Sequence, residues 1–243
     1  MKDSTMQETA APQGSAPLRV LIMTAVEAER NAVLRGLSRG GAASAPASDG
    51  GPAFDVRLAG VGSALAAAST AAELAADGGY ELVVSAGIGG GFPGRAPVGS
   101  LVVASDIVAA DLGAETADGF AAVDELGFGS ARVPVAEGLA ARWTAALESA
   151  GLPVCSGPVL TLSTVTGTAA TAELLAARVP GAAAEAMEGF GVAVAARRLG
   201  LPVLEIRAIS NAVGPRQREL WKIGDALQAL ELACSYLPEV LQS

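Results

Sequence analysis

Short apolar runs alternate with longer amphipathic or alanine-rich segments along most of the chain. Apolar runs bounded by turn residues predict buried strands, whereas the longer segments predict helices. The expected strands cover residues 18–24, 54–59, 81–86, 99–109, 153–162 and 202–209. The expected helices cover residues 25–37, 63–76, 137–150, 169–178 and 216–237, with one more that opens at Met187-Glu188. This alternation predicts an α/β fold with a mixed, mostly parallel central sheet flanked by helices on both faces.

Several segments fall outside this alternation. Residues 1–17 are small, polar and interrupted by proline and glycine, so we expect a disordered N-terminal tail before a single domain at 18–243. Residues 40–52 predict a loop, and the acidic residues 111–131 predict an irregular surface excursion. The glycine-rich residues 87–94 predict either a flexible turn or a backbone that lies close to another segment or to a ligand.

Histidine is absent from the sequence, which restricts the chemistry that it can perform. Ser-His-Asp and Cys-His catalytic groups are excluded, and no imidazole can hold a metal ion. Acid-base chemistry near neutral pH therefore falls to Asp, Glu, Lys, Tyr or Cys. The two cysteines, Cys155 and Cys234, lack any ligand-like spacing. We expect them to be packed in the core, with no disulfide and no metal site.

The net charge of -9 and the pI of about 4.6 disfavour nucleic acid and anionic membranes as partners, because both require a basic surface. No apolar run is long enough to cross a bilayer, and the N-terminus lacks the features of a signal peptide. The turn at Gly60-Val61-Gly62 resembles half of a dinucleotide fingerprint, but Leu65 replaces its third glycine. We therefore expect a cytoplasmic protein that binds a small molecule and needs no cofactor.

Three polar residues lie near the predicted ends of strands. Glu29 follows the first strand, Glu188 stands at the start of a helix, and Asn211 follows the strand at 202–209. Ligands of parallel α/β sheets bind at the carboxyl ends of strands. Taken singly, the glutamates could merely complement helix N-termini, and Asn211 could merely form a turn. Their joint occurrence in a chain without histidine favours one shared site.

Four motifs occur in order along the chain: A-V-E-A-E after the first strand, S-A-G-I-G-G-G, A-M-E and R-A-I-S-N. Together they resemble the purine nucleosidase and phosphorylase superfamily over nearly all residues from Leu18 onward. Within it, the run S-N-A-V-G-P-R-Q-R-E-L-W-K-I resembles the futalosine hydrolases, nucleosidases of an alternative menaquinone pathway. The resemblance implies hydrolysis of the N-glycosidic bond of futalosine with release of hypoxanthine. It also implies a homo-oligomer, a dimer or larger, whose neighbouring subunit could complete the pocket for the 5′ substituent.

The resemblance also implies a role for each matching residue. Glu29 would activate the attacking water, Glu188 would bind the ribose 2′- and 3′-hydroxyls, and Asn211 would face the base. The remaining implied contacts lie along the sugar or the purine edge: Met187, Gly87, Ile88, Val165 and Thr166.

Asn211 departs from the methylthioadenosine nucleosidase pattern, in which an aspartate protonates purine N7. A carboxamide has an NH₂ donor and a C=O acceptor, which suit the O6 of hypoxanthine and an N7 that bears a proton. Because asparagine cannot supply that proton, water or another relay is needed. A mispaired buried polar edge costs several kcal/mol, so this single residue predicts the exclusion of adenine.

Three alternatives stay open at this point: a methylthioadenosine or adenosylhomocysteine nucleosidase that releases adenine, a phosphate-dependent purine nucleoside phosphorylase, and an inactive nucleoside-binding module. The negative charge of Glu27 and Glu29 favours water over phosphate as the acceptor. Arg216 and Arg218 could meet a carboxylate of the substrate or serve only as solvated surface, and Trp221 could be core or a lid over the pocket.

Overall fold

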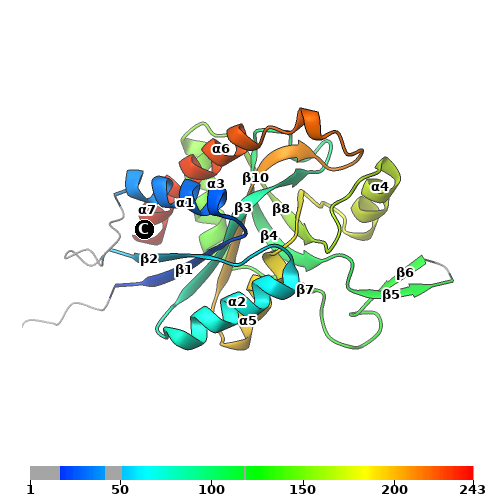
Figure 1. Cartoon of the computed structure of the whole chain (residues 1–243), viewed down its shortest axis with the longest axis horizontal. Helices are drawn as coiled ribbons and strands as arrows, with labels where there is room; N and C mark the ends of the chain where they lie inside the picture. Colours follow the sequence, from blue (N-terminus) through cyan, green and yellow to red (C-terminus); the bar gives the residue numbers. More distant parts are fainter. Residues whose placement is uncertain (1–16, 42–50, 118, 243) are drawn as a thin grey trace, which may run out of the picture.

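The computed structural model describes residues 17–41, 51–117 and 119–242 (Figure 1). The predicted tail, apart from Pro17, and most of the predicted loop at 40–52 lie outside the described residues. The strands of the central sheet are β1 (Arg19–Thr24), β2 (Ala53–Leu58), β3 (Leu82–Gly91), β4 (Leu101–Ala109), β7 (Arg132–Pro134), β8 (Val154–Thr161), β9 (Ala184–Ala186) and β10 (Val203–Ala212). The helices are α1 (Glu27–Arg39), α2 (Ser63–Ala76), α3 (Glu137–Ser149), α4 (Ala169–Arg178), α5 (Gly189–Arg198), α6 (Ile223–Ser235) and α7 (Leu237–Gln242).

Neighbouring strands follow the order β2-β1-β3-β9-β8-β4-β10, and β10 pairs with β3 as well as with β4. Strands β3, β9, β8, β4 and β10 therefore close into a ring, to which β1 and β2 are added on one side. The pairs β1–β2, β1–β3, β3–β10, β4–β8 and β8–β9 are parallel, whereas β3–β9, β4–β7 and β4–β10 are antiparallel. The predicted mixed, mostly parallel sheet is confirmed.

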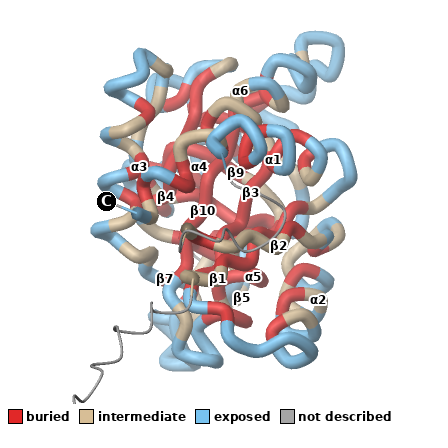
Figure 2. The backbone as a smooth tube through the Cα atoms, turned by 90° about the vertical axis from the view of Figure 1, so that its left-hand side faces the viewer, coloured by how far each residue is buried: buried red, intermediate tan, exposed pale blue. Residues whose placement is uncertain are grey.

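Helices cover both faces of this sheet, as predicted. Side chains of α1, α3, α6 and α7 pack on one face and those of α2 and α5 on the other. Alternation along β1 supplies both cores: Val20 and Ile22 point to the first face, whereas Leu21 and Met23 point to the second. Figure 2 shows the resulting distribution, with buried backbone in the sheet and exposed backbone on the outer helices. Among the described residues, no helix is long and apolar enough to cross a membrane.

The glycine-rich segment is mostly a strand and not a turn, which corrects one of the two predictions for residues 87–94. β3 continues to Gly91, because β10 and β9 pair with its glycines. These positions are glycine because neighbouring atoms leave no room for a Cβ. A Cβ at Gly89 would lie 2.7 Å from the carbonyl oxygen of Glu185. The other prediction for this segment, a close approach of backbone, is confirmed.

Two further segments differ from the prediction. The segment at 111–131 is not wholly irregular, because it contains a hairpin of β5 (Gly113–Thr116) and β6 (Gly119–Ala122). The helix predicted at 216–237 corresponds to α6, which begins at Ile223 and not at Arg216, since the preceding residues form a short 3₁₀ turn at Arg218–Leu220. The backbone N–H of Lys222 then donates to the carbonyl of Ser210 over 2.8 Å, which holds this segment against the end of β10.

Candidate active site

A cavity of about 240 Å³ lies where the carboxyl ends of β1, β3 and β10 meet. It is lined by Ala25, Val26, Glu29, Val61, Ile88, Gly89, Gly90, Leu162, Val165, Glu185, Ala186, Met187, Glu188, Ser210, Asn211 and Trp221. Glu29, Glu188 and Asn211, which are remote in sequence, thus share one cavity. Met187, Ile88 and Val165 line it as well, as expected.

Glu29 is placed by the first turn of α1 and is only 3% exposed. Its Oε2 accepts from the backbone N–H of Ala25 (2.9 Å) and Val26 (3.2 Å), and its Oε1 accepts from that of Ile88 (2.9 Å). Three of the carboxylate's four lone pairs are thus occupied within the described residues, which leaves one at Oε1 for a water molecule. Burial raises the pKa of Glu29 above its ordinary value, while Arg207 and the Ile88 N–H oppose the shift.

Glu188 precedes the first residue of α5 and is also buried. Its Oε1 accepts from the backbone N–H of Gly62 over 3.2 Å. Its Oε2 accepts from the N–H of Met187 over 3.3 Å and contacts Nη1 of Arg207 at 3.4 Å. Gly62 has a φ of +93°, a left-handed conformation that glycine adopts without strain. The G-V-G turn therefore contributes an amide that positions Glu188.

A β-bulge near the end of β10 orients the side chain of Asn211. The pairing of β10 with β3 shifts between Ile209 and Asn211, which leaves Ser210 as an extra residue. The Ser210 hydroxyl then donates to Oδ1 of Asn211 over 2.8 Å, and Nδ2 of Asn211 donates to the carbonyl of Ala212 over 3.1 Å. These contacts orient the amide and leave one N–H and one oxygen lone pair free to meet a ligand.

Arg207 is a buried cation behind the cavity that the sequence reasoning missed. It is 1% exposed and contacts Glu188, Glu205 and Ser85. Burial by itself lowers the pKa of Arg207, but Glu205, Glu188 and Glu29 outweigh it, so that the pKa is raised and the guanidinium stays charged. A signal for it exists in the sequence: Glu205 and Arg207 are charged residues two apart within an otherwise apolar strand.

Two expected ligand contacts do not line the cavity, although both support it. Thr166 donates from its backbone N–H (3.0 Å) and its hydroxyl (2.5 Å) to the carboxylate of Glu185. It therefore holds Glu185, which lines the cavity, and burial raises the pKa of that carboxyl against these hydrogen bonds. Gly87 lies behind the cavity wall, where a Cβ would be 2.6 Å from Oε1 of Glu29 and 2.7 Å from Nη1 of Arg207.

Gly87→Ala is expected to lower turnover strongly, because the new methyl group displaces Glu29 or Arg207 from fixed positions. Overpacking of this kind costs about 1–3 kcal/mol of stability. Gly138→Ala is the matched control, since a Cβ at Gly138 meets nothing within 4 Å. Turnover and thermal unfolding of both variants check the expectation, and equal turnover in the two would contradict it.

Trp221 lines the cavity and is half-buried, which supports a position at the pocket and not in the core. The guanidinium carbons of Arg216 and Arg218 lie 5.1 Å and 5.9 Å from the centre of its ring. Both arginines are exposed. The structure therefore brings these two cations to an aromatic side chain of the cavity.

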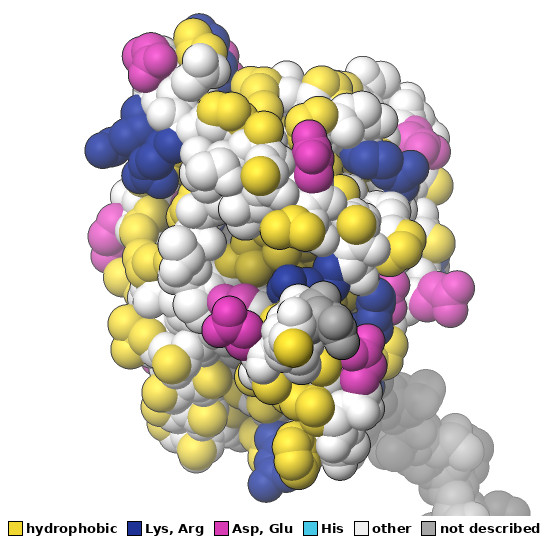
Figure 3. Space-filling model, turned by 90° about the vertical axis from the view of Figure 1, so that its right-hand side faces the viewer, with side chains coloured by type: hydrophobic (Ala, Val, Ile, Leu, Met, Phe, Trp, Pro, Cys, Tyr) yellow, Lys and Arg dark blue, Asp and Glu magenta, His cyan; other side chains and the backbone are white. Residues whose placement is uncertain are grey.

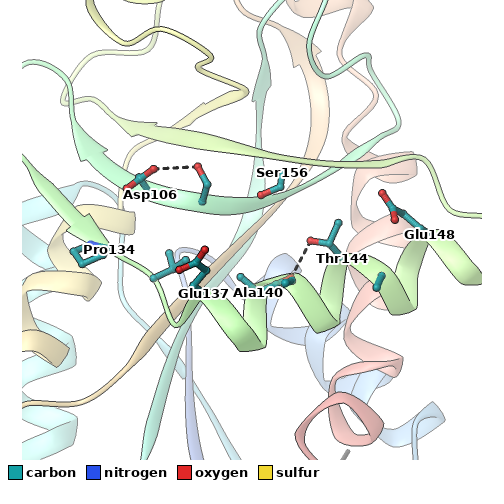
Figure 4. A pocket seen from close by; sticks show the side chains of 11 residues that line it. Asp106, Pro134, Glu137, Ala140, Thr144, Glu148 and Ser156 are labelled. Carbon is teal, nitrogen blue, oxygen red and sulfur yellow. Dashed lines mark hydrogen bonds between the residues drawn. The ribbon is translucent and has the colours of Figure 1, made fainter.

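A larger hollow of about 610 Å³ lies elsewhere, between α3 and the strands β4 and β8 (Figure 4). Its polar side chains include Asp106, Glu137, Thr144, Glu148 and Ser156. None of the residues expected at a site lines this hollow. Among the described residues, no cluster of three or more His, Cys, Asp or Glu side chains is arranged to hold a metal ion. Figure 3 shows a face on which charges of both signs are scattered in small groups. The cavity that contains Glu29 is therefore the candidate site.

Comparison with known proteins identifies the family to which the chain belongs. The family model "Phosphorylase superfamily" matches residues 49–242. A futalosine hydrolase of Streptomyces coelicolor is 56% identical over 238 residues, which cover 93% of this chain and 97% of that protein. The structure of futalosine hydrolase from Helicobacter pylori has a TM-score of 0.73 at 18% identity, covering 93% of this chain and 97% of that one.

The 5′-methylthioadenosine/S-adenosylhomocysteine nucleosidase of Helicobacter pylori is as similar in fold, with a TM-score of 0.74 at 17% identity over 93% of this chain and 98% of that one. The TM-score therefore does not distinguish a futalosine hydrolase from a methylthioadenosine nucleosidase. The 56% sequence identity to the Streptomyces coelicolor protein does distinguish them. The chain belongs to the phosphorylase superfamily and, within it, to the futalosine hydrolase family.

Proposed function

We propose that this protein hydrolyses the N-glycosidic bond of futalosine and releases hypoxanthine, as a step of menaquinone biosynthesis in the cytoplasm. Two curated relatives at 56% and 46% identity are futalosine hydrolases. The observation that carries the proposal is the convergence of Glu29, Glu188 and Asn211 on one cavity. These side chains supply a base, an acceptor for hydroxyl groups and a polar group for the purine edge.

Glu29 and Glu188 serve the sugar end of the reaction. Water attacks C1′ and transfers a proton to Glu29, while the bond from C1′ to the purine nitrogen breaks and its electron pair leaves with the base. The sugar passes through a cationic, oxocarbenium-like state, which the nearby carboxylates stabilise. Glu188 accepts hydrogen bonds from the ribose hydroxyls, and a bond to the 2′-hydroxyl strengthens as positive charge develops.

Asn211 serves the base. Its free N–H donates to O6 of hypoxanthine, and its oxygen accepts from an N7 that carries a proton. Asparagine has no acidic proton to give, so the proton that neutralises the departing purine comes from water. An adenine in the same place would set its exocyclic NH₂ against the amide N–H, which leaves a buried donor unpaired.

Water, and not phosphate, is the acceptor in this proposal. Among the described residues that line the cavity, every charged side chain is a glutamate: Glu29, Glu185 and Glu188. Phosphate would meet this negative wall without a facing cation, since Arg207 lies behind the wall in contact with Glu188 and Glu205. A phosphorylase needs the opposite charge at this end of the cavity.

The test is turnover of futalosine in phosphate-free buffer, with both products separated by chromatography. We expect hypoxanthine and the free sugar product at a rate that added phosphate does not change. A strict requirement for phosphate, with a sugar 1-phosphate as product, would replace hydrolysis by phosphorolysis. Absence of turnover under both conditions would refute the proposal and leave two alternatives, the adenine-releasing nucleosidase and the nucleoside-binding module.

We further propose that the protein acts as a homo-oligomer. Val26 and Val61 line the cavity yet are 42% and 54% exposed, and a neighbouring subunit would cover both. Light scattering after size exclusion measures the mass in solution, and a monomer at assay concentration would contradict this proposal.

A further inference from the structure

The buried pair of Glu205 and Arg207 has no part in the reaction described above. Both side chains extend from the same face of β10, and their exposed fractions are 0% and 1%. Nε of Arg207 donates to Oε1 of Glu205 over 2.8 Å. A buried ion pair is a poor source of stability, because well-packed apolar residues of similar volume often do as well or better. Its presence directly behind a catalytic cavity therefore calls for a functional reason.

The guanidinium of Arg207 is surrounded by carboxylates from separate elements. Its Nη1 contacts Glu188 at the start of α5, and its Nη2 donates to the hydroxyl of Ser85 in β3 over 3.0 Å. The place where a Cβ of Gly87 would stand lies 2.7 Å from this Nη1 and 2.6 Å from Oε1 of Glu29. The missing side chain of Gly87 thus allows the cation and the proposed base to approach each other.

Space for the Glu205 carboxylate is provided by a second glycine. A Cβ on Gly189, the first residue of α5, would collide with both carboxylate oxygens of Glu205. Oε2 of Glu205 is buried and has no hydrogen-bond partner within the described residues. The positive end of the α5 dipole faces this region, which favours a negative charge there. The carboxylate is therefore held against Arg207 without a role in hydrogen bonding beyond that pair.

The charges explain what such a carboxylate does. An uncompensated Arg207 would place a positive charge behind the sugar at the moment when the sugar itself becomes cationic. It would also pull the pKa of Glu29 down and weaken it as a base. The groups that face Glu29 are Arg207 from β10 and Glu188 from α5, while Glu185 from β9 lines the same cavity. Among these groups, only Arg207 is positive.

We propose that Glu205 is a positioning residue that fixes Arg207 behind the sugar end of the cavity and neutralises its charge, so that Glu29 and Glu188 dominate the field at the sugar. The inference rests on the proposed nucleosidase function. Arg207 then acts as a neutralised anchor for Glu188, and the cavity remains negative when the oxocarbenium-like state forms.

The first test compares Glu205→Gln with the wild type. The amide keeps the volume and an oxygen for Arg207 but removes the charge. Turnover is expected to fall at least tenfold with little change in KM, since the lost field acts mainly on the cationic state. The acid limb of the kcat/KM profile is expected to move to lower pH by about one unit, because the uncompensated Arg207 favours ionised Glu29. An unmoved limb would overturn the proposal.

The second test is the double variant Glu205→Gln with Arg207→Met, which removes both charges of the buried pair, so that neither member is left charged without the other. If the pair is neutral as a unit, removing both members moves the acid limb by less than about half a unit. A rise of one unit or more would show that Glu205 had not been cancelling Arg207, and would overturn the proposal even if the single variant failed to fold.

Two controls separate this proposal from the proposed function. Glu231→Gln removes a carboxylate that pairs with Arg35 and Arg39 at 2.7 Å each, outside the cavity, and should leave the limb in place. Carboxyl ¹³C NMR titration of glutamate-labelled protein reads the pKa of Glu29 without any substrate, its resonance being identified by its loss in Glu29→Gln. The same downward shift in Glu205→Gln is expected there. Failure of futalosine turnover would therefore refute the function without deciding the role of Glu205.

Discussion

Glu29→Gln is expected to lower kcat by about 10²–10⁴-fold, the usual contribution of a positioned general base. The amide cannot accept a proton from the attacking water, and its NH₂ group faces a backbone N–H that the carboxylate accepts from in the wild type. That mismatch costs about 1–3 kcal/mol of stability, which is small enough for the fold to persist. Single-turnover kinetics and thermal unfolding measure the two effects separately.

Glu27→Gln is the matched control for this variant. Glu27 lies two residues earlier on α1, is exposed and pairs only with Arg30 at 3.0 Å among the described residues. Its replacement should leave turnover unchanged.

Burial raises the pKa of Glu29 above the ordinary 4.5. Ionised Glu29 is therefore lost as the pH falls through that raised value, and kcat/KM of the wild type should already decline above pH 4.5. Turnover of Glu29→Gln within about threefold of the wild type would exclude Glu29 as the base.

Asn211→Asp is expected to reverse the preference for the base. A protonated aspartate donates to N7 and leaves an oxygen for the exocyclic NH₂ of adenine, whereas it presents no N–H to O6 of hypoxanthine. Sites built to hydrogen-bond one polar group discriminate strongly against an analogue that leaves groups unpaired. We expect the ratio of kcat/KM for futalosine over methylthioadenosine to fall by at least about 10²-fold.

The exposed Asn31→Asp on α1 makes the same substitution outside the cavity and serves as the control. Ser210 still donates to residue 211 in the aspartate variant, so the side chain keeps one of its two anchors. Initial rates with each nucleoside, followed by chromatography of the released base, give the ratio. An unchanged ratio in Asn211→Asp would mean that residue 211 does not determine the selectivity between hypoxanthine and adenine.

Prediction from sequence succeeded where local pattern and chain order carry the information. Alternation of apolar runs and helical segments is a property of each segment, so the layers of the fold could be anticipated. Glu29, Glu188 and Asn211 could be placed together because parallel strands end at one edge of the sheet. The short strands β7 and β9 could not be predicted, because three residues form a strand only through their pairing partners.

The missed parts of the site depend on contacts between distant segments. The local sequence around Arg207 does not indicate that its side chain contacts Ser85 and Glu188, which lie 122 and 19 residues away in sequence. Thr166 was expected at the purine edge, whereas its backbone N–H and hydroxyl donate to Glu185, 19 residues away in sequence. The glycines of β3 look like a turn by propensity, and they form a strand only because β10 and β9 pair with them. Tertiary packing decided each of these cases.

The central claim is that two glutamates and one asparagine make this cavity a hydrolase for a 6-oxopurine nucleoside. The most direct measurement is a competition between futalosine and methylthioadenosine at equal concentration in one phosphate-free mixture, with the released bases quantified together. The account predicts that hypoxanthine is released first and in large excess. Release of adenine at an equal or higher rate would contradict it.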